Sequence, residues 1–259
     1  MKHILLTNDD GIDAHGLHLV AEALSKRNDV RVTIVAPTDQ QSATSHSLTL
    51  RVPLRIVEYG ENRYGVTGTP TDCVLVAVEH ILKNDTPDLV ISGVNHGANM
   101  GEDVTYSGTV AAALEGAIMG LPSYALSCTS WHPKDWGAVE AYLEHHLDDL
   151  LAVPLDKHSL LNVNIPDCPA SEIRGIKTCP LGSRSYFDVI IEQKDPRGRP
   201  YLWIGGSGPT WAELPGTDAV LNQQGYVVIT PLKVDMTHKD MLQQMSDFEH
   251  EGPLRTGDA

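Results

Sequence analysis

Short apolar runs and segments with helical spacing alternate along the first 165 residues of the chain. Several of the apolar runs are rich in β-branched residues, and Pro37 ends the run at 30–36. Runs of this kind are typical of strands that are buried on both faces of a sheet. The pattern predicts strands at residues 3–7, 30–36, 88–92, 121–127 and 160–165.

The segments between these runs carry apolar residues at helical intervals. In residues 16–26, for example, Leu17, Val20 and Leu24 fall on one face of a helix. The segment 136–151 has the same amphipathic character, and 109–119 is rich in small residues. The pattern predicts helices at residues 16–26, 71–82, 109–119 and 136–151.

Strands that alternate with helices favour parallel βαβ units with right-handed crossovers. The sequence therefore predicts an α/β fold with a doubly wound, mostly parallel sheet and helices on both of its faces. Ligands of such sheets bind beyond the carboxyl ends of the strands. Every loop that leaves a predicted strand is consequently a candidate for the functional site.

The pattern changes after residue 166. Two strand-like segments surround the turn at 195–200, and 205–216 is rich in glycine and proline, which is typical of a loop. One more strand-like run follows, and residues 235–259 are polar and weakly patterned. The strands expected outside the alternating region are 188–194, 201–204 and 226–230, together with an extended or edge element at 47–59.

The length of 259 residues suits one α/β domain with an appendage. We expect a single domain over residues 1–259, with a core of about 1–180 and a β-rich hairpin extension and C-terminal tail in about 181–259. The hydrophobic fraction of 41% and the charged fraction of 20% are those of an ordinary globular protein.

The chain is acidic, with 34 Asp and Glu against 19 Lys and Arg and a formal net charge of −15. This balance argues against a protein that coats duplex nucleic acid or an anionic membrane. A small phosphorylated substrate stays compatible with it, provided that a metal ion or a helix dipole supplies local positive charge.

Four cysteines occur without a close CxxC pair, which argues against a zinc cluster. The N-terminus lacks the pattern of a signal peptide, and no apolar run approaches the roughly 20 residues of a membrane helix. We therefore expect reduced thiols and a cytoplasmic protein. The four tryptophans show no spacing typical of a base-stacking platform, which favours packing roles for Trp131, Trp136, Trp203 and Trp211.

Two adjacent carboxylates, Asp9 and Asp10, follow the first predicted strand. They would repel a phosphate unless a cation lay between them. Neighbouring side chains of a straight strand point to opposite faces, but a turn at Gly11 allows both carboxylates to converge. The alternative is that they only form a turn or cap a helix. On the residues alone, a metal site and a structural turn are about equally favoured.

Three later loops add further polar groups. Residues 39–47 are dense in hydroxyls, and residues 91–103 contain three glycines with Asn95 and His96. Asn95 offers a carbonyl oxygen to a metal, and His96 can donate to a phosphate or act as an acid. Each loop also has an ordinary reading, as a solvated loop or as a tight turn with a surface histidine.

The fourth stretch, Tyr106-Ser107-Gly108-Thr109, begins the predicted helix at 109–119. Free amides and the positive end of a helix dipole make such a start an anion site. In a doubly wound sheet all four loops can meet at one edge. Their donors would all be oxygen, which selects a hard cation such as Mg²⁺ or Mn²⁺.

Taken together, these stretches resemble the survival protein SurE family, the stationary-phase 5′-nucleotidases. They occur in family order and span nearly the whole chain: TNDDG (7–11), VAP (35–37), QSATSHSLT (41–49), TGTPTDC (67–73), ISGVNHGANMGEDVTYSGTVAAALEG (91–116) and GYVVITPL (225–232). The match is looser between Ser183 and Asp218, a region that looks like the family's protruding hairpin and neighbouring loop.

The resemblance implies a Rossmann-like core and one divalent cation per subunit. It places the metal ligands on Asp9, Asp10, Ser42 and Asn95. It places the phosphate-binding Ser-Gly-Thr on Ser107, Gly108 and Thr109. Asn99 lies in the same matching loop, and we expect Asn95, His96 and Asn99 to contribute to phosphate binding.

The activity implied is hydrolysis of nucleoside 5′- and 3′-monophosphates, and the resemblance raises cleavage of short polyphosphate as a second activity. It also implies a homodimer or homotetramer in which C-terminal segments exchange. For the chemistry we expect water to attack the phosphomonoester, with Asp10 as the first choice of general base. A covalent aspartyl-phosphate ranks second, because the haloacid-dehalogenase pattern places its two acids two residues apart.

Two other function classes stay open at this stage. The same loops could form a nucleotide-binding module without turnover. They could also serve a glycosyltransferase, which uses metal-bound carboxylates near a nucleotide. Release of free phosphate from AMP without a sugar acceptor distinguishes a phosphatase from both.

Overall fold

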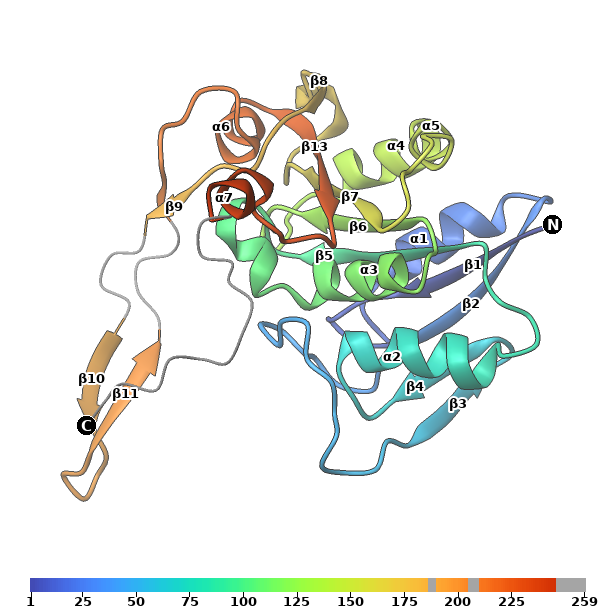
Figure 1. Cartoon of the computed structure of the whole chain (residues 1–259), viewed down its shortest axis with the longest axis horizontal. Helices are drawn as coiled ribbons and strands as arrows, with labels where there is room; N and C mark the ends of the chain where they lie inside the picture. Colours follow the sequence, from blue (N-terminus) through green and yellow to red (C-terminus); the bar gives the residue numbers. More distant parts are fainter. Residues whose placement is uncertain (186–189, 205–209, 246–259) are drawn as a thin grey trace.

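The computed structural model describes residues 1–185, 190–204 and 210–245 (Figure 1). A nine-stranded sheet forms the centre, in the order β3-β4-β2-β1-β5-β6-β7-β13-β8. The strands from β4 to β7 are parallel, β3 is antiparallel to β4, and β13 is antiparallel to β7. The strands are β1 (Lys2–Thr7), β2 (Val30–Pro37), β3 (Ile56–Gly60), β4 (Arg63–Val66), β5 (Leu89–His96), β6 (Ser123–Cys128), β7 (Ser159–Ile165), β8 (Gly175–Thr178) and β13 (Tyr226–Lys233).

Helices cover both faces of this sheet (Figure 1). The helices α1 (His15–Ser25), α4 (Gly137–His145) and α5 (Leu147–Leu151) pack over one face, where the largest cluster of buried apolar residues lies. The helices α2 (Pro70–Val76) and α3 (Gly108–Ile118) cover the other face with two smaller clusters. The predicted mostly parallel, doubly wound α/β sheet is confirmed.

The chain reverses its direction of winding at β1. It leaves β1 through α1 to reach β2 on one side, and it returns through α2 to β5 on the other side. A crevice opens where strand order reverses in this way, outside the carboxyl ends of the two strands. The ends of β1 and β5 carry the first and third polar stretches of the sequence, so the topology brings these two stretches together.

Several elements differ from the prediction. The short strands β4 and β8 were not predicted, because their sequences RYGV and GIKT are polar and lie at or near the sheet edges. The helix predicted at 136–151 is two helices that meet at His146, and the helix predicted at 71–82 continues beyond α2 as a π-helical turn, Ala77–Ile81. The strand β13, which was expected after the alternating region, lies in the central sheet and is antiparallel to β7.

The extension contains the predicted hairpin, formed by β10 (Ile190–Lys194) and β11 (Pro200–Ile204), which projects from the body (Figure 1). A second short pair joins β9 (Arg184–Ser185) to β12 (Thr210–Trp211), and α6 (Asp218–Gln223) precedes β13. Part of the expected tail is helical, as α7 (Lys239–Gln244). Residues 188–189 of the predicted strand, 205–209 of the predicted loop and 246–259 of the tail lie outside the described residues.

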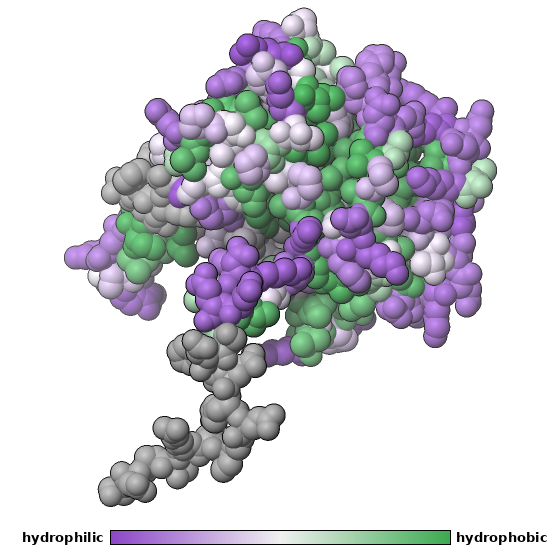
Figure 2. All heavy atoms as spheres, turned by 45° about the horizontal axis from the view of Figure 1, so that its top comes forward, coloured by the Kyte–Doolittle hydropathy of each residue, from purple (hydrophilic) through white to green (hydrophobic). Residues whose placement is uncertain are grey.

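Hydrophilic and hydrophobic residues are interspersed on the face of the molecule that Figure 2 shows. Hydrophilic residues are dense along its right-hand margin. Among the described residues, no helix combines the length and the apolar character that crossing a membrane requires.

Candidate active site

The turn after β1 brings the two adjacent carboxylates to one place. The Asn8 side chain closes this turn: its Nδ2 donates to the Gly11 carbonyl at 2.9 Å, and its Oδ1 accepts from the Gly11 N–H at 3.2 Å. Gly11 adopts a φ of +104°, a conformation that side-chain-bearing residues rarely adopt. Asp9 is 4% exposed and the Asp10 side chain is also 4% exposed, so the turn buries both carboxylates.

Asp9 lies against the start of α3. The Thr109 hydroxyl donates to Asp9 Oδ1 at 2.5 Å, across 100 residues of sequence. Gly108 permits this approach, because a Cβ on it would lie 2.8 Å from Asp9 Cβ and 3.0 Å from Asp9 Oδ2. The glycine of the Ser-Gly-Thr stretch is therefore required by contact with Asp9, whatever its role toward a phosphate.

Asp10 lies against the end of β5. The His96 N–H donates to Asp10 Oδ2 at 2.9 Å, and His96 Nδ1 lies 3.9 Å from the same oxygen. The His96 ring packs on Trp136 with centroids 5.2 Å apart. Its Nε2 is buried and has no hydrogen-bond partner among the described residues. This placement favours a role for His96 in holding Asp10, and its contribution to phosphate binding stays a prediction.

The two carboxylates are electrostatically unfavourable as they stand. Burial raises the pKa of Asp9 to about 7, against a lowering effect of the Thr109 hydrogen bond and a further rise from the charge of Asp10. Burial also raises the pKa of Asp10, while the N–H and the charge of His96 lower it. In the described part of the chain, no ion pair joins Lys or Arg to either carboxylate. Two buried carboxylates that no Lys or Arg among the described residues pairs with are the arrangement that a divalent cation stabilises.

The remaining predicted metal ligands are next in sequence to residues that contact the Asp9–Asp10 turn, since Asn95 precedes His96 and Ser42 follows Gln41. Asn95 Nδ2 donates to the Gly97 carbonyl at 2.8 Å, and its Oδ1 accepts no hydrogen bond from the described residues. Ser42 is exposed and its Oγ accepts from Gln40 Nε2 at 3.1 Å, while the neighbouring Gln41 N–H donates to the Asp9 carbonyl at 2.7 Å. The donor set is all oxygen and fits a hard cation. The roles of Asp9, Asp10, Ser42 and Asn95 as ligands stay a prediction.

The loop that carries Ser42 is tied to both helices of the α2/α3 face. The Ser45 N–H donates to the Tyr106 carbonyl at 3.0 Å, and His46 Nε2 lies 2.7 Å from Glu115 Oε2 on α3. The Thr49 N–H donates to Asp72 Oδ1 on α2 at 3.0 Å. These contacts bring the hydroxyl-rich loop to the carboxyl edge of the sheet, as its position after a strand predicts.

The start of α3 is the candidate anion site. Ser107 is its N-cap, and its Oγ accepts from the Val110 N–H at 3.0 Å. Gly108 and Thr109 are the first two residues of the helix. Their N–H groups therefore have no carbonyl of a preceding helical turn to which they could donate. These amides and the helix dipole suit a phosphate beside Asp9. The Thr109 hydroxyl itself is turned to Asp9, so the amides are the better candidates for phosphate contact.

Asn99 belongs to a buried polar network that the sequence analysis missed. Its N–H donates to Asn164 Oδ1 at 2.8 Å, its Nδ2 donates to Ser127 Oγ at 2.8 Å, and its carbonyl accepts from Asn162 Nδ2 at 2.7 Å. These contacts fix the loop that leads to α3. The signal was present, since Asn162 and Asn164 are two residues apart in a predicted strand and therefore share one face.

Asp218 is a second residue that the sequence analysis missed. It is fully buried at the start of α6, and it accepts from the N–H groups of Gly101 at 2.9 Å and Gly182 at 2.7 Å. Burial raises its pKa, although these hydrogen bonds favour the charged form. Asp218 thus joins the extension to the loop that leads to α3.

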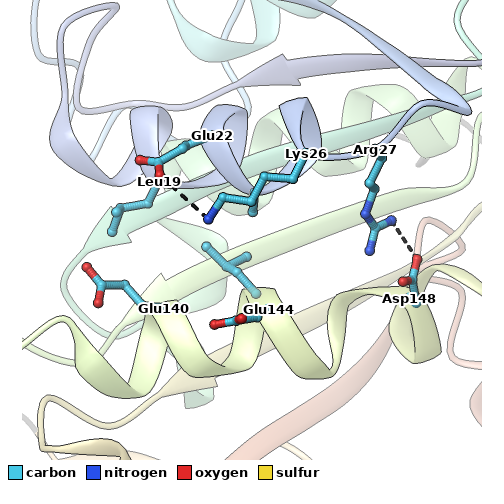
Figure 3. Close-up of a pocket in the computed structure, with 9 residues that line it drawn as sticks. Leu19, Glu22, Lys26, Arg27, Glu140, Glu144 and Asp148 are labelled. Atoms are coloured by element: carbon cyan, nitrogen blue, oxygen red, sulfur yellow. Dashed lines mark ion pairs between the residues drawn. The ribbon is translucent and has the colours of Figure 1, made fainter.

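A groove of about 470 Å³ lies elsewhere, between α1 and α4 (Figure 3). It is lined by residues of α1 and the turn that follows it, by residues of α4, and by Asp148 of α5. Lys26 is paired with Glu22, and Arg27 is paired with Asp148. Its polar groups are thus largely engaged with each other, and it holds none of the predicted site residues.

Comparisons with known proteins agree with this arrangement. Residues 4–188 match the family model described as survival protein SurE. A protein of Gemmatimonas aurantiaca named 5′-nucleotidase SurE is 49% identical over 255 residues, which is 96% of this chain and 99% of that protein. A protein of Vibrio cholerae with the same name is 45% identical and covers 96% of this chain and 98% of its own length.

A solved structure gives the same result. The crystal structure of the SurE protein from Aquifex aeolicus superposes with a TM-score of 0.81 at 37% identity. The match covers 96% of this chain and 100% of that chain. The resemblance expected from the motifs is confirmed, and this chain belongs to the survival protein SurE family.

Proposed function

We propose that the protein is a 5′-nucleotidase, a divalent-metal-dependent phosphomonoesterase that hydrolyses nucleoside 5′- and 3′-monophosphates to nucleoside and phosphate. The observation that carries the proposal is the buried Asp9–Asp10 pair beside the free amides of α3. The name of the relatives, 5′-nucleotidase SurE, supports the same substrate class. Cleavage of short polyphosphate stays a prediction. The terminal phosphate of such a chain would contact the same groups as the phosphate of a nucleotide.

We propose different roles for the residues of this site. Asp9, Asp10 and the side-chain carbonyl oxygen of Asn95 would hold one Mg²⁺ or Mn²⁺. The hydroxyl of Ser42, whose loop contacts α2 and α3, would be the fourth ligand. A bound cation of this kind offsets phosphate charge and lowers the pKa of coordinated water. The amides at the start of α3 would hold the remaining phosphate oxygens. Phosphoryl transfer depends chiefly on positioning and charge stabilisation, and this inventory provides both.

Asp10 stays our first choice of general base. His96 keeps it in place through the hydrogen bond from its backbone N–H to Oδ2. In this proposal Oδ1 accepts the proton of the attacking water. Burial raises the pKa of Asp10 in the metal-free protein, and a carboxylate with a higher pKa is a better proton acceptor. Protonation of the leaving oxygen by His96 stays a prediction, and its Nε2 is buried, without a partner among the described residues, beside Trp136.

Assembly into a homodimer or homotetramer is also proposed. The hairpin β10–β11 projects from the body and exposes apolar side chains. The exposed fraction is 60% for Trp203 and 82% for Ile204. Exposed apolar surface of this kind favours contact with another copy of the chain. The expected exchange of C-terminal segments falls largely on residues outside the described ones.

The test is phosphate release from AMP, GMP, CMP and UMP, measured with Mg²⁺, with Mn²⁺ and with a chelator. We expect release with a metal and none with the chelator. Release from AMP without any sugar acceptor argues against a glycosyltransferase. A folded protein that binds nucleotides but releases no phosphate under any metal would contradict the proposal and favour a binding module.

Gly108→Ala is expected to weaken Mn²⁺ binding by about ten- to a hundred-fold, because ligand-orienting contacts carry effects of that size. The added Cβ would lie 2.8 Å from Asp9 Cβ and 3.1 Å from Pro70 Cγ, so Asp9 must move. Calorimetric titration with Mn²⁺ measures the affinity. Gly137→Ala is the control, since its φ is not in the left-handed region and its added Cβ would lie within 3 Å of only Asp135 Oδ1, the end of a side chain that can rotate. Unchanged affinity in Gly108→Ala would contradict the proposed role of Asp9.

A further inference from the structure

The aromatic residue Trp131 occupies an unusual position at the carboxyl edge of the sheet. It lies in the loop after β6, and 62% of it is exposed. The expectation that it is a packing residue is therefore wrong. Trp136, five residues later, is partly buried and packs against His96 and His15 with centroids 5.2 and 5.1 Å apart. Trp131 is thus largely exposed, whereas Trp136 packs against neighbouring rings.

One face of the Trp131 indole rests on the main chain of Gly97. A Cβ on Gly97 would lie 3.2 Å from Cδ2 and 3.3 Å from both Cε2 and Cε3. Nearly equal distances to three adjacent ring atoms place this point over the ring face and not at its edge. Gly97 has a φ of +119° and no side chain, so it allows this contact. The high exposure of the residue leaves the opposite ring face open to solvent.

Gly97 also connects the indole to the candidate metal site. Its N–H donates to the Cys128 carbonyl at 2.9 Å, and its own carbonyl accepts from Asn95 Nδ2 at 2.8 Å. Gly97, on which the indole rests, follows Asn95 by two residues, which is about 7 Å in an extended chain. This length is comparable to the distance that the ribose spans between the phosphate and the base of a nucleotide.

The loop holds the indole in this position through main-chain contacts. The Thr129 N–H donates to the Ile165 carbonyl at 2.9 Å, and the N–H groups of Lys134 and Asp135 donate to Asp167 Oδ1, both at 3.0 Å. One end of the loop is therefore fixed to the last residue of β7 and the other to Asp167, two residues after it. A platform that is held before the ligand arrives loses little conformational entropy on binding.

From these contacts we propose that Trp131 is the platform on which the nucleobase of the substrate stacks, an inference that rests on the proposed nucleotidase function. The open indole face suits the flat π-surface that every base presents. The ring offers only one hydrogen-bond donor, Nε1, so it cannot read the edge of a base in detail. The expected substrate class is therefore nucleoside monophosphates with any base, with purines preferred for their larger stacking surface.

The test compares AMP with ribose 5-phosphate, which has the same phosphate and sugar but no base. In Trp131→Ala we expect kcat/KM for AMP to fall by about five- to a hundred-fold, the range of single base–aromatic stacks, through a higher KM and an unchanged kcat. The values for ribose 5-phosphate should not change. Trp131→Phe should restore most of the lost activity toward AMP, and His132→Ala, an exposed neighbour, should leave it unchanged.

An equal fall for both substrates, or no fall for AMP, overturns the platform. A binding measurement separates this outcome from failure of the proposed function. If the wild type releases phosphate from neither substrate, calorimetric titration with AMP and ribose 5-phosphate still tests whether Trp131 binds the base. Weaker binding of AMP alone in Trp131→Ala supports the platform, and equal AMP binding by wild type and variant overturns it.

Discussion

Asp9→Asn is expected to reduce metal-dependent phosphate release from AMP by at least about a thousandfold. The substitution keeps the size of the side chain but removes one of the two buried negative charges that would hold the cation. Metal coordination at a phosphoryl oxygen contributes several kcal/mol to the transition state, and each 1.36 kcal/mol changes the rate tenfold. The Thr109 hydroxyl can still donate to the Asn oxygen, so the contact with α3 is kept.

The same substitution should stabilise the metal-free protein at alkaline pH. Burial raises the pKa of Asp9 to about 7 in the folded protein, against 3.8 for an ordinary aspartate. Between these values the folded state binds more protons than the unfolded state, so the free energy of unfolding falls as pH rises through this window. Asn carries no charge to bury, and the gain above pH 7 is at most about 4 kcal/mol by the pKa difference.

Thermal unfolding in chelator at pH 5 and pH 8 measures this effect. Asp9→Asn should unfold at a higher temperature than the wild type at pH 8, and the two should be closer at pH 5. Added Mn²⁺ should raise the unfolding temperature of the wild type and leave that of the variant nearly unchanged. Asp13→Asn is the matched control, because Asp13 is exposed and paired with Arg63. A variant that keeps wild-type turnover would contradict the metal-ligand role of Asp9.

The sequence predicted the strand ends but not the contacts that join them. Asp9, Asp10 and Asn95 were found because they follow short apolar runs, and parallel strands bring their carboxyl ends to one edge. The Asp9–Thr109 hydrogen bond spans 100 residues, and no local pattern predicts a contact of that range. Local periodicity reports which face of an element is buried, but not which partner covers it.

The elements that were not predicted share a physical cause. β4 and β8 are short and polar, and their place in the sheet depends on pairing with β2 and β13 more than on their own burial. Trp131 shows the opposite error: a large aromatic residue is expected to be buried, yet this one lies on a glycine surface with its other face open. Departures from local expectation are often found at functional sites.

Gly16→Ala is expected to destabilise the protein by about 3 kcal/mol, at the upper end of the usual cost of overpacking. A Cβ at this position would lie 1.9 Å from the Val94 carbonyl oxygen and 2.9 Å from its carbon, both of them backbone atoms of β5. No side-chain rotation relieves this overlap, so α1 must move away from the sheet. In an open helix the same substitution is favourable by about 1 kcal/mol, so a loss of stability isolates the steric effect.

The expected fall in unfolding temperature is about 6–12 °C, since a chain of this size loses about 2–4 °C per kcal/mol. Gly137→Ala at the start of α4 is the matched control, because its added Cβ would meet at 2.9 Å only the carboxylate of Asp135, which can rotate. Val94 immediately precedes Asn95, so displacement of α1 should also weaken Mn²⁺ binding in Gly16→Ala. An unfolding temperature equal to that of the wild type would show that α1 does not pack as closely on β5 as these distances require. A lower unfolding temperature with unchanged Mn²⁺ affinity would instead separate the stability of this contact from the geometry of the site.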